Sequence, residues 1–248
     1  MGLRALLVTS RVTFVPENYN QLVCGLAENP HIVGCLVIDN RDWRLVAQGL
    51  ALIVTGAGPR LGFQLLKNFF NDLLASKKYT YEKAGKSFFV VQDLNSEEAL
   101  KILRRENVDL ILNARTRTIF KKTLLSTPRL GCINIHHGLL PDQRGLMCDF
   151  WAHLEKTPSG FSIHQMTSKL DAGAILKVVE VPTAKSDYLR SIYEGSKHEL
   201  AAAKEALSEI AQSGAVSGTE NVKTENTLYR KNPTLLDFFK LQFKGTKI

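Results

Sequence analysis

The sequence predicts an α/β fold: a Rossmann-like, doubly wound, mostly parallel sheet with helices on both faces. Short apolar runs, of the kind that strands buried on both faces require, alternate with segments of helical period. The first three segments already form a strand–helix–strand unit, with apolar runs at Leu3–Thr9 and Ile32–Ile38 and a helical pattern at Asn20–Glu28 between them. Such a unit predicts parallel strands joined by a right-handed crossover.

The rest of the chain continues this alternation. Residues 41–78 interrupt it and are predicted to be a helical insertion, with one helix near 43–53 and a second at 61–74. Gly214–Glu225 is small and polar and is expected to be a mobile loop, whereas the basic tail Tyr229–Ile248 is expected to pack back on the domain. Further strands are predicted at Phe88–Val91, Val108–Leu112, Gly131–Ile135, Phe161–Met166 and Ala174–Val181, and further helices at 97–106, 121–126, 146–155 and 194–212.

Length and composition describe one large domain of an ordinary globular protein. The chain has 248 residues, of which 44% are hydrophobic and 23% are charged. We expect residues 1–190 to form the main domain, and residues 191–248 to add a C-terminal helix and a tail to it. Within the insertion, Gly56–Gly62 has the spacing GxGxxxG, which is compatible with a phosphate loop or with a turn between two helices. The turn is favoured because this stretch does not join a strand to a helix, and whether it binds a ligand is left open.

Composition also restricts the classes of function. No run of about 18 apolar residues occurs, so a membrane-spanning helix is not expected, and the N-terminus lacks the cleavage site of a signal sequence. Four cysteines without a CxxC pair predict reduced, mostly buried thiols and a cytoplasmic protein. A net charge of +8 permits an anionic partner, but the basic residues are spread out, so nucleic acid is not favoured. The histidine and cysteine spacing is not that of a zinc site, and no metal is expected.

The stretch 131–145 carries the densest chemistry. A short apolar strand ends in Asn134, His136 and His137, and the chain then turns at Pro141. Asn134 and His136 are two residues apart, so on a strand both side chains point to the same face, and His137 points to the other. An amide that donates a hydrogen bond and a ring that protonates near neutral pH therefore lie together at the end of a buried strand.

Two loops are predicted to lie beside this strand end. Arg115–Thr118 follows the strand at Val108–Leu112, and the loop Thr167–Gly173 follows the strand at Phe161–Met166, which makes Asp171 the plausible carboxylate partner of His136. An amide, an imidazole and a carboxylate at one point suit acyl transfer to an amine. The first two can hydrogen-bond the oxyanion of a tetrahedral intermediate, and the third can keep the imidazole charged and relay a proton through water.

These residues also carry a family resemblance. Cys-Ile-Asn-Ile-His followed by Gly-Leu-Leu-Pro and Arg-Gly, at 132–145, resembles the signature of the 10-formyltetrahydrofolate-dependent formyltransferases. Ser-Ile-His-Gln-Met at 162–166 and Leu-Asp-Ala-Gly-Ala-Ile-Leu at 170–176 resemble the second block of that family, and the match covers about residues 105–182. The resemblance implies that Asn134, His136 and Asp171 act at the formyl group of 10-formyltetrahydrofolate, without a metal.

The resemblance further implies where the folate lies. Its pterin ring is expected between the loop Arg115–Phe120 and the loop Thr167–Asp171. Residues expected to bind it are Arg117, Thr118, Ile119, Phe120, Leu125, Cys132, Leu139, Met166, Thr167, Lys169 and Leu170. Arg11, Arg144 and His164 are candidates for binding the acceptor, although Arg144 is also suited to closing the turn at 141–145, and His164 to supporting the site from the core.

Departures from the family pattern reduce the number of acceptor classes that this chain is expected to use. Many members carry Ser where this chain has Gly138, and the stretch 10–16 lacks the Gly/Ser/Asn-rich phosphate loop of the glycinamide-ribonucleotide transformylases. The segment after Val181 is predicted to be a helix and a tail, without the C-terminal β-barrel domain of methionyl-tRNA formyltransferases. The first strand starts at Leu3, without the N-terminal regulatory domain of formyltetrahydrofolate hydrolases.

The sequence thus predicts a formyltransferase that acts on a primary amine of a small molecule, with or without phosphate, such as an amino sugar attached to a nucleotide. Three alternatives stay open. The first is a formyltetrahydrofolate hydrolase. The second is a glycinamide-ribonucleotide or methionyl-tRNA formyltransferase-like enzyme, and the third is a non-catalytic folate-binding relative. A homodimer is also left open.

Overall fold

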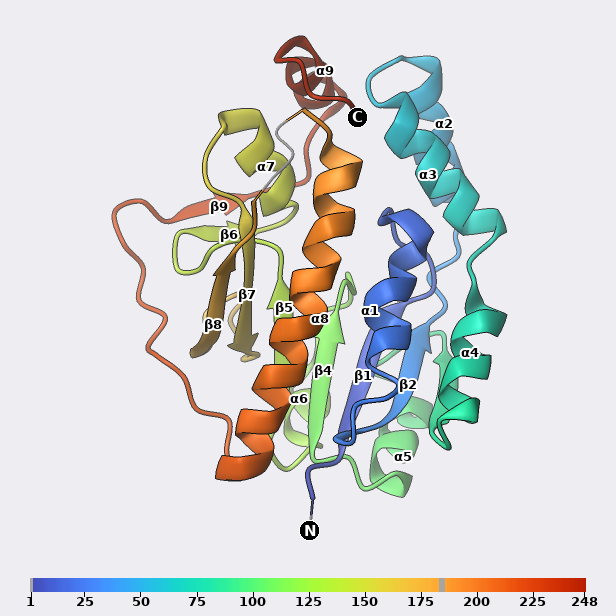
Figure 1. Cartoon of the computed structure of the whole chain (residues 1–248), viewed down its shortest axis with the longest axis vertical. Helices are drawn as coiled ribbons and strands as arrows, with labels where there is room; N and C mark the ends of the chain where they lie inside the picture. The colour runs from blue at the N-terminus through green and yellow to red at the C-terminus, as the bar shows by residue number, and fades with distance from the viewer. Residues whose placement is uncertain (1, 183–185) are drawn as a thin grey trace.

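The computed structural model describes residues 2–182 and 186–248. Its main sheet has seven strands in the order β3-β2-β1-β4-β5-β7-β8 (Figure 1). β1 to β5 are parallel to one another, and β7 runs antiparallel to both β5 and β8. The predicted α/β fold with a mostly parallel sheet is therefore confirmed. The strands are β1 (Ala5–Ser10), β2 (Ile32–Ile38), β3 (Ser87–Val91), β4 (Leu110–Ala114), β5 (Cys132–His136), β7 (Gly160–Gln165) and β8 (Ile175–Glu180).

Helices cover both faces of this sheet, because every residue of β1 is buried and successive side chains face opposite sides. Leu7 belongs to a core shared with α1 (Asn20–Gly25), α4 (Leu74–Lys83) and α8 (Tyr188–Ser213). Leu6 and Val8 belong to a second core, shared with α5 (Glu97–Arg105) and α6 (Lys122–Ser126). Figure 1 shows α1, α4 and α8 in front of the sheet and α5 and α6 behind it.

The insertion forms a helical hairpin of α2 (Trp43–Val54) and α3 (Pro59–Phe70). The stretch Gly56–Gly62 makes the predicted turn between two helices, with Gly58 N bonded to Leu52 O at 3.2 Å. A Cβ at Gly62 would lie 2.5 Å from Gly49 O, so glycine at this crossing permits the close approach of α2 and α3. A separate helix, α4, follows, which the sequence analysis did not predict because its residues lack a clear apolar stripe.

A third core joins the hairpin to the C-terminal part of the chain. Leu52 and Leu61 pack with Phe150 of α7 (Cys148–Glu155) and with Phe238 of α9 (Leu235–Phe243). The tail does pack back on the domain as predicted, yet Phe243 is 88% exposed and takes no part in that packing.

The segment 214–225 is not free along its length, contrary to the expectation of a mobile loop. Thr219 exchanges two backbone hydrogen bonds with Ile175, both 2.9 Å long. The amide of Asn221 donates to the backbone oxygens of Asp171 and Gly173, each at 3.0 Å. Beyond it, β9 (Leu228–Arg230) pairs with β6 (Gln143–Gly145) in a small second sheet. This polar segment therefore ties the tail to the loop that carries Asp171.

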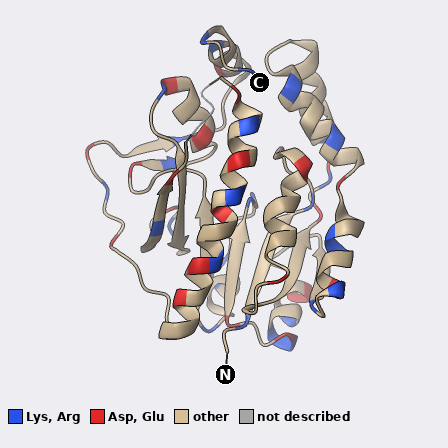
Figure 2. Ribbon diagram, viewed as in Figure 1, with Lys and Arg blue, Asp and Glu red and all other residues tan. Residues whose placement is uncertain are grey.

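Charge is dispersed over the fold. Figure 2 shows Lys and Arg interspersed with Asp and Glu along α8, with no single basic stripe in that view. None of the helices in the described part of the chain is long and apolar enough to cross a membrane. All four cysteines are free, three of them buried, in agreement with the sequence prediction.

Candidate active site

A cavity of about 550 Å³ lies at the carboxyl ends of β1, β4 and β5. This is the edge at which doubly wound sheets bind ligands. Asn134, His136 and Asp171 all line the cavity, together with His164. Because β7 runs antiparallel to β5, the loop after β7 begins beside the amino end of β5, away from the cavity. Asp171 reaches the cavity only because this loop folds back over the sheet.

Asn134 is held by a chain of hydrogen bonds that begins on the neighbouring strand. Thr116 Oγ1 donates to Asn113 Oδ1, and Asn113 Nδ2 donates to Asn134 Oδ1, each at 2.7 Å. Asn134 Nδ2 lies 3.2 Å from His164 Nε2. These contacts fix both ends of the amide and use one of the two Nδ2 hydrogens, so the second remains to donate into the cavity.

The His164 ring is oriented by its two nitrogens. Nδ1 lies 2.8 Å from Gln165 O and donates to it, which leaves Nε2 as an acceptor for the Asn134 amide. Burial, together with the nearby His136, lowers the pKa of His164 to about 4. The ring is therefore neutral at pH 7, as its role of acceptor requires.

His136 is bonded on one side and open on the other. Its Nε2 lies 2.7 Å from Gln143 O and donates to that backbone carbonyl. Its Nδ1 faces Asp171, 3.6 Å from Oδ1. The side chains of both residues are buried, at 7% and 6% exposure, so their interaction is weakly screened by solvent.

The Asp171 carboxylate is fixed by its surroundings on three sides. Oδ2 accepts from Gly145 N at 2.9 Å, and Oδ1 lies 3.7 Å from His164 Nε2. Its backbone has a positive φ of 47°, and its carbonyl accepts from Asn221. A non-glycine residue in this conformation is held there by its neighbours, and here the segment 214–225 supplies one of the bonds.

The tight packing around Gly138 explains why this chain has glycine at a position where many members of the family carry serine. A Cβ at this position would lie 2.7 Å from Gln143 O, 2.8 Å from Cys148 Cβ and 2.8 Å from His136 Nε2. A serine would therefore displace the hydrogen bond that holds the catalytic candidate His136.

The structure brings only part of the predicted folate-binding set to the cavity. Those that line it are Arg117, Thr118, Met166, Thr167, Lys169 and Leu170. Among the described residues, Phe120, Leu125 and Cys132 do not line the cavity because they pack into the core under α5 and α6. Ile119 is 82% exposed outside it, and Leu139 is also absent from the lining.

Two predicted acceptor residues are engaged elsewhere. Arg11 forms ion pairs with Asp39 and Asp72 and does not line the cavity. Arg144 is 1% exposed and donates to Pro141 O, to Asn221 and to the Tyr229 hydroxyl, so it closes the turn and anchors the tail. Sequence reasoning missed these partners because they are distant in the chain.

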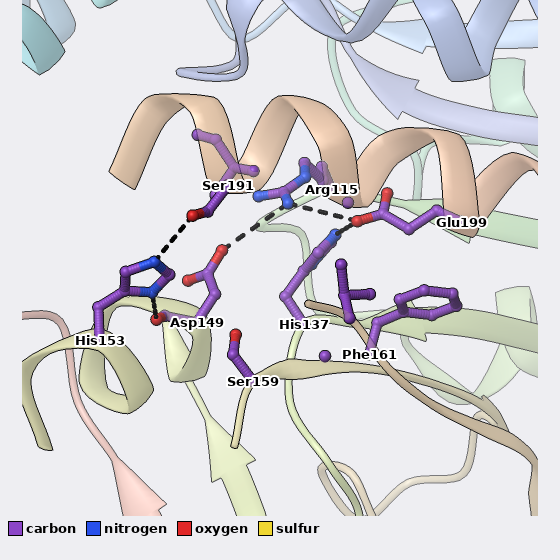
Figure 3. Close-up of a pocket in the computed structure, with 12 residues that line it drawn as sticks. Arg115, His137, Asp149, His153, Ser159, Phe161, Ser191 and Glu199 are labelled. Carbon is purple, nitrogen blue, oxygen red and sulfur yellow. Dashed lines mark hydrogen bonds and ion pairs between the residues drawn. The ribbon is translucent and has the colours of Figure 1, made fainter. Parts of the chain in front are cut away.

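A second cluster, which we call closed because its charged groups contact one another, lies on the other face of the β5 end (Figure 3). His137 Nε2 lies 3.2 Å from Glu199 Oε1 of α8, and Arg115 lies 3.6 Å from the same carboxylate and 3.8 Å from Asp149. These side chains line a cavity of about 30 Å³, and Arg115, His137 and Asp149 also contribute to the lining of the large cavity. Burial alone would raise the pKa of Glu199, but His137 and Arg115 outweigh it and lower the pKa to about 2.

Several supporting residues escaped the sequence reasoning. Asn113 had a detectable signal, since it is a polar residue inside the apolar run of β4. Asn221 and Glu199 had none, because one lies in a polar segment and the other is one of several glutamates on α8. Among residues 2–182 and 186–248, no three or more His, Cys, Asp or Glu side chains gather in a way that could hold a metal ion.

The fold and this site place the protein in a known class. A family model described as formyl transferase matches residues 71–208, which is more than half of the chain and includes Asn134, His136 and Asp171. The chain belongs to the formyl transferase family.

Relatives agree with this assignment. The chain is 37% identical over 128 residues to a methionyl-tRNA formyltransferase of Geobacillus sp. (strain WCH70), covering 51% of this chain and 40% of that enzyme. It is 31% identical over 150 residues to that of Macrococcus caseolyticus (strain JCSC5402), covering 60% and 47%. The chain thus spans less than half the length of these curated relatives.

Solved structures share the fold at low sequence identity. A sugar N-formyltransferase from Shewanella sp FDAARGOS_354 aligns with a TM-score of 0.57 and 21% identity, covering 96% of this chain and 86% of that one. Glycinamide ribonucleotide transformylase 1 from Symbiobacterium toebii aligns with a TM-score of 0.60 and 16% identity, covering 86% and 89%.

Proposed function

We propose that this protein transfers the formyl group of 10-formyltetrahydrofolate to a primary amine of a small molecule. The observation that carries the proposal is the meeting of Asn134, His136 and Asp171 on one wall of a large cavity, in a chain of the formyl transferase family. An amide donor, an imidazole and a carboxylate lining the same cavity are the groups that acyl transfer to an amine requires.

The cavity suits a folate. Its volume of about 550 Å³ falls in the usual range for small-molecule sites. One half of it, which we call the donor half, is bounded by the loops 116–118 and 166–170. Arg117 and Lys169 lie on these loops with exposed side chains, and are the groups we assign to a carboxylate at the far end of the donor. When bound, the donor supplies a formyl carbon attached to a nitrogen leaving group.

Asn134 and His136 are assigned to the oxyanion that develops when the amine attacks the formyl carbon. Asn134 offers the second hydrogen of an amide whose orientation is fixed by Asn113 and His164. His136 offers Nδ1 when protonated, because its Nε2 is already bonded to Gln143 O. Two donors held in advance need no reorganisation as negative charge develops, which is the usual source of large rate effects.

Asp171 is assigned to the removal of the proton that the attacking amine loses. Its carboxylate lies beside His136 Nδ1, and the oxygen near both histidines can take the proton of the attacking amine through one water. His164 is a positioning residue, since it contacts the Asn134 amide and lies beside Asp171.

The proposal is tested by product analysis with the purified chain. Incubation with 10-formyltetrahydrofolate and a panel of primary amines should give an N-formyl product and tetrahydrofolate in equal amounts. Formate released at the full rate without any amine would contradict the proposal and favour hydrolysis. Tight folate binding with no turnover on any amine would also contradict it and favour a binding protein.

A further inference from the structure

The half of the cavity opposite the donor loops is built from parts of the chain that the catalytic residues do not use. We call it the acceptor half. It is bounded by the loop after β1, by the inner sides of α2 and α3, and by the start of α9. Its apolar side chains include Phe14, Leu45, Leu52, Leu65, Leu235 and Phe238, and Gln48 and Asn232 contribute polar atoms.

The loop after β1 is poorly suited to hold a phosphate, because three of its consecutive backbone donors are already bonded within the protein. Arg11 N donates to Ile38 O at 2.8 Å, Val12 N to Asn40 Oδ1 at 2.9 Å, and Thr13 N to Asn18 Oδ1 at 2.8 Å. Anion sites in such folds depend on backbone N–H groups that point toward the ligand. Here three consecutive groups point away from it.

The cations near this loop are likewise engaged. Arg11 is paired with Asp39 and Asp72 outside the cavity. Arg115 is nine-tenths buried, lies between Glu199 and Asp149, and stacks over the Phe14 ring at 5.4 Å. Within the described lining, the cations without such partners are Arg117 and Lys169, and both lie on the donor loops.

From these observations we infer that the acceptor half binds a primary amine carried on an apolar body, aliphatic or aromatic, without a phosphate or nucleotide. This inference rests on the proposed function and names the substrate class of the same site. Burial of an alkyl or aryl group against the apolar side chains of this half drives binding. A nucleotide diphosphate at this position would lose its hydration, and among the described lining residues of this half it would meet neutral amides such as those of Gln48 and Asn232 but no unpaired cation.

α2 provides a matched pair of variants. Leu45 lines the cavity, whereas Leu50, on the same helix, is 48% exposed and outside the lining. Leu45→Gln therefore makes the acceptor half polar, and Leu50→Gln makes the same chemical change without touching it. Neither side chain is fully buried, so both variants are expected to fold.

The test measures binding rather than turnover. The full chain, saturated with the unreactive isomer 5-formyltetrahydrofolate, is titrated calorimetrically with octylamine, 2-phenylethylamine, glucosamine 6-phosphate and a uridine-diphosphate amino sugar. We expect the two apolar amines to bind at least about tenfold more tightly than the phosphorylated ones. Leu45→Gln should weaken octylamine binding about tenfold, the effect of losing one buried aliphatic contact, and Leu50→Gln less than about twofold.

Two outcomes would overturn the inference. One is tighter binding of either phosphorylated amine, and the other is an equal effect of the two leucine variants. Turnover of the uridine-diphosphate amino sugar with 10-formyltetrahydrofolate would overturn the acceptor class while supporting formyl transfer. Binding of octylamine without its formylation would contradict formyl transfer while supporting the acceptor class.

Discussion

Two adjacent histidines at the end of β5 face opposite sides of the sheet and belong to clusters of different kinds. His136 has one nitrogen bonded to Gln143 O and the other turned toward Asp171 on the wall of the large cavity. His137 faces α8, next to Glu199, beside a cavity of about 30 Å³, and it also contributes to the lining of the large cavity. The side chains are 7% and 16% exposed, so burial does not distinguish them.

The two clusters differ in whether their hydrogen-bonding groups are free to meet a ligand in the cavity. In the His136 cluster, the second hydrogen of the Asn134 amide and the Nδ1 of the ring are available to a ligand. In the His137 cluster, one guanidinium lies between two carboxylates, so each of these charges has an opposite charge beside it within the protein. Both clusters border the large cavity, since Arg115, His137 and Asp149 also contribute to its lining, so we expect function at the cluster whose hydrogen-bonding groups are free to meet a ligand.

The largest expected effect is on the open cluster. Asn134→Ala removes one of two oxyanion donors and should lower kcat by about 10² to 10³, with little change in the free energy of unfolding. Steady-state formyl transfer and urea denaturation measure the two quantities. Asn226→Ala, an exposed asparagine, is the control and should change neither. Full activity of Asn134→Ala would remove the amide from the mechanism.

The closed cluster should respond in the opposite way. Glu199→Gln leaves Arg115 and His137 without their carboxylate and should lower the free energy of unfolding by about 3 kcal/mol. kcat per folded molecule should fall far less than with Asn134→Ala. Urea denaturation is the measurement, and Glu205→Gln, an exposed glutamate on the same helix, is the control. An unchanged stability with lost activity would show that the closed cluster serves the chemistry.

The smallest effect is a pH dependence at the junction of the open cluster with the core. Because the pKa of His164 is about 4 in the folded protein and about 6.5 when unfolded, the unfolded chain binds the proton first as the pH falls. Stability should be constant above pH 6.5 as far as this residue is concerned, and should fall by about 2 kcal/mol between pH 6.5 and 5. His164→Gln keeps an acceptor for Asn134 and should flatten that part of the profile; an unchanged slope would assign it to other groups.

Much of the fold followed from local patterns. The strand at Ile32–Ile38 has the predicted bounds, and β1, β3, β5, β7 and β8 lie within two residues of theirs, because each is an apolar run bounded by turn residues. α4 was missed because it has no apolar stripe, and the segment 214–225 was taken as free because its two anchors, Ile175 and Asp171, are distant in sequence.

The charged residues were the hardest to place. Arg11 and Arg144 were candidates for the acceptor because an arginine near a strand end often binds an anion. Arg11 instead pairs with carboxylates 28 and 61 residues away, and Arg144 with a tail 77 and 85 residues away. No local sequence pattern predicts such partners, because a charged side chain pairs with the groups that the fold places within a few ångströms of it.

By itself, the sequence determined the sheet and the chemical groups of the site. The two-residue spacing of Asn134 and His136 on a strand puts them on one face wherever that strand lies, and the apolar runs force it into the sheet. Only the tertiary structure decided which groups remain open to a ligand. Asp171 reaches His136 by a loop folded back over the sheet, and the arginines and backbone donors near the acceptor half are used within the protein. Which groups remain open depends on contacts between distant segments, because the partners of hydrogen-bonding and charged groups are set by closeness in space and not by closeness along the chain.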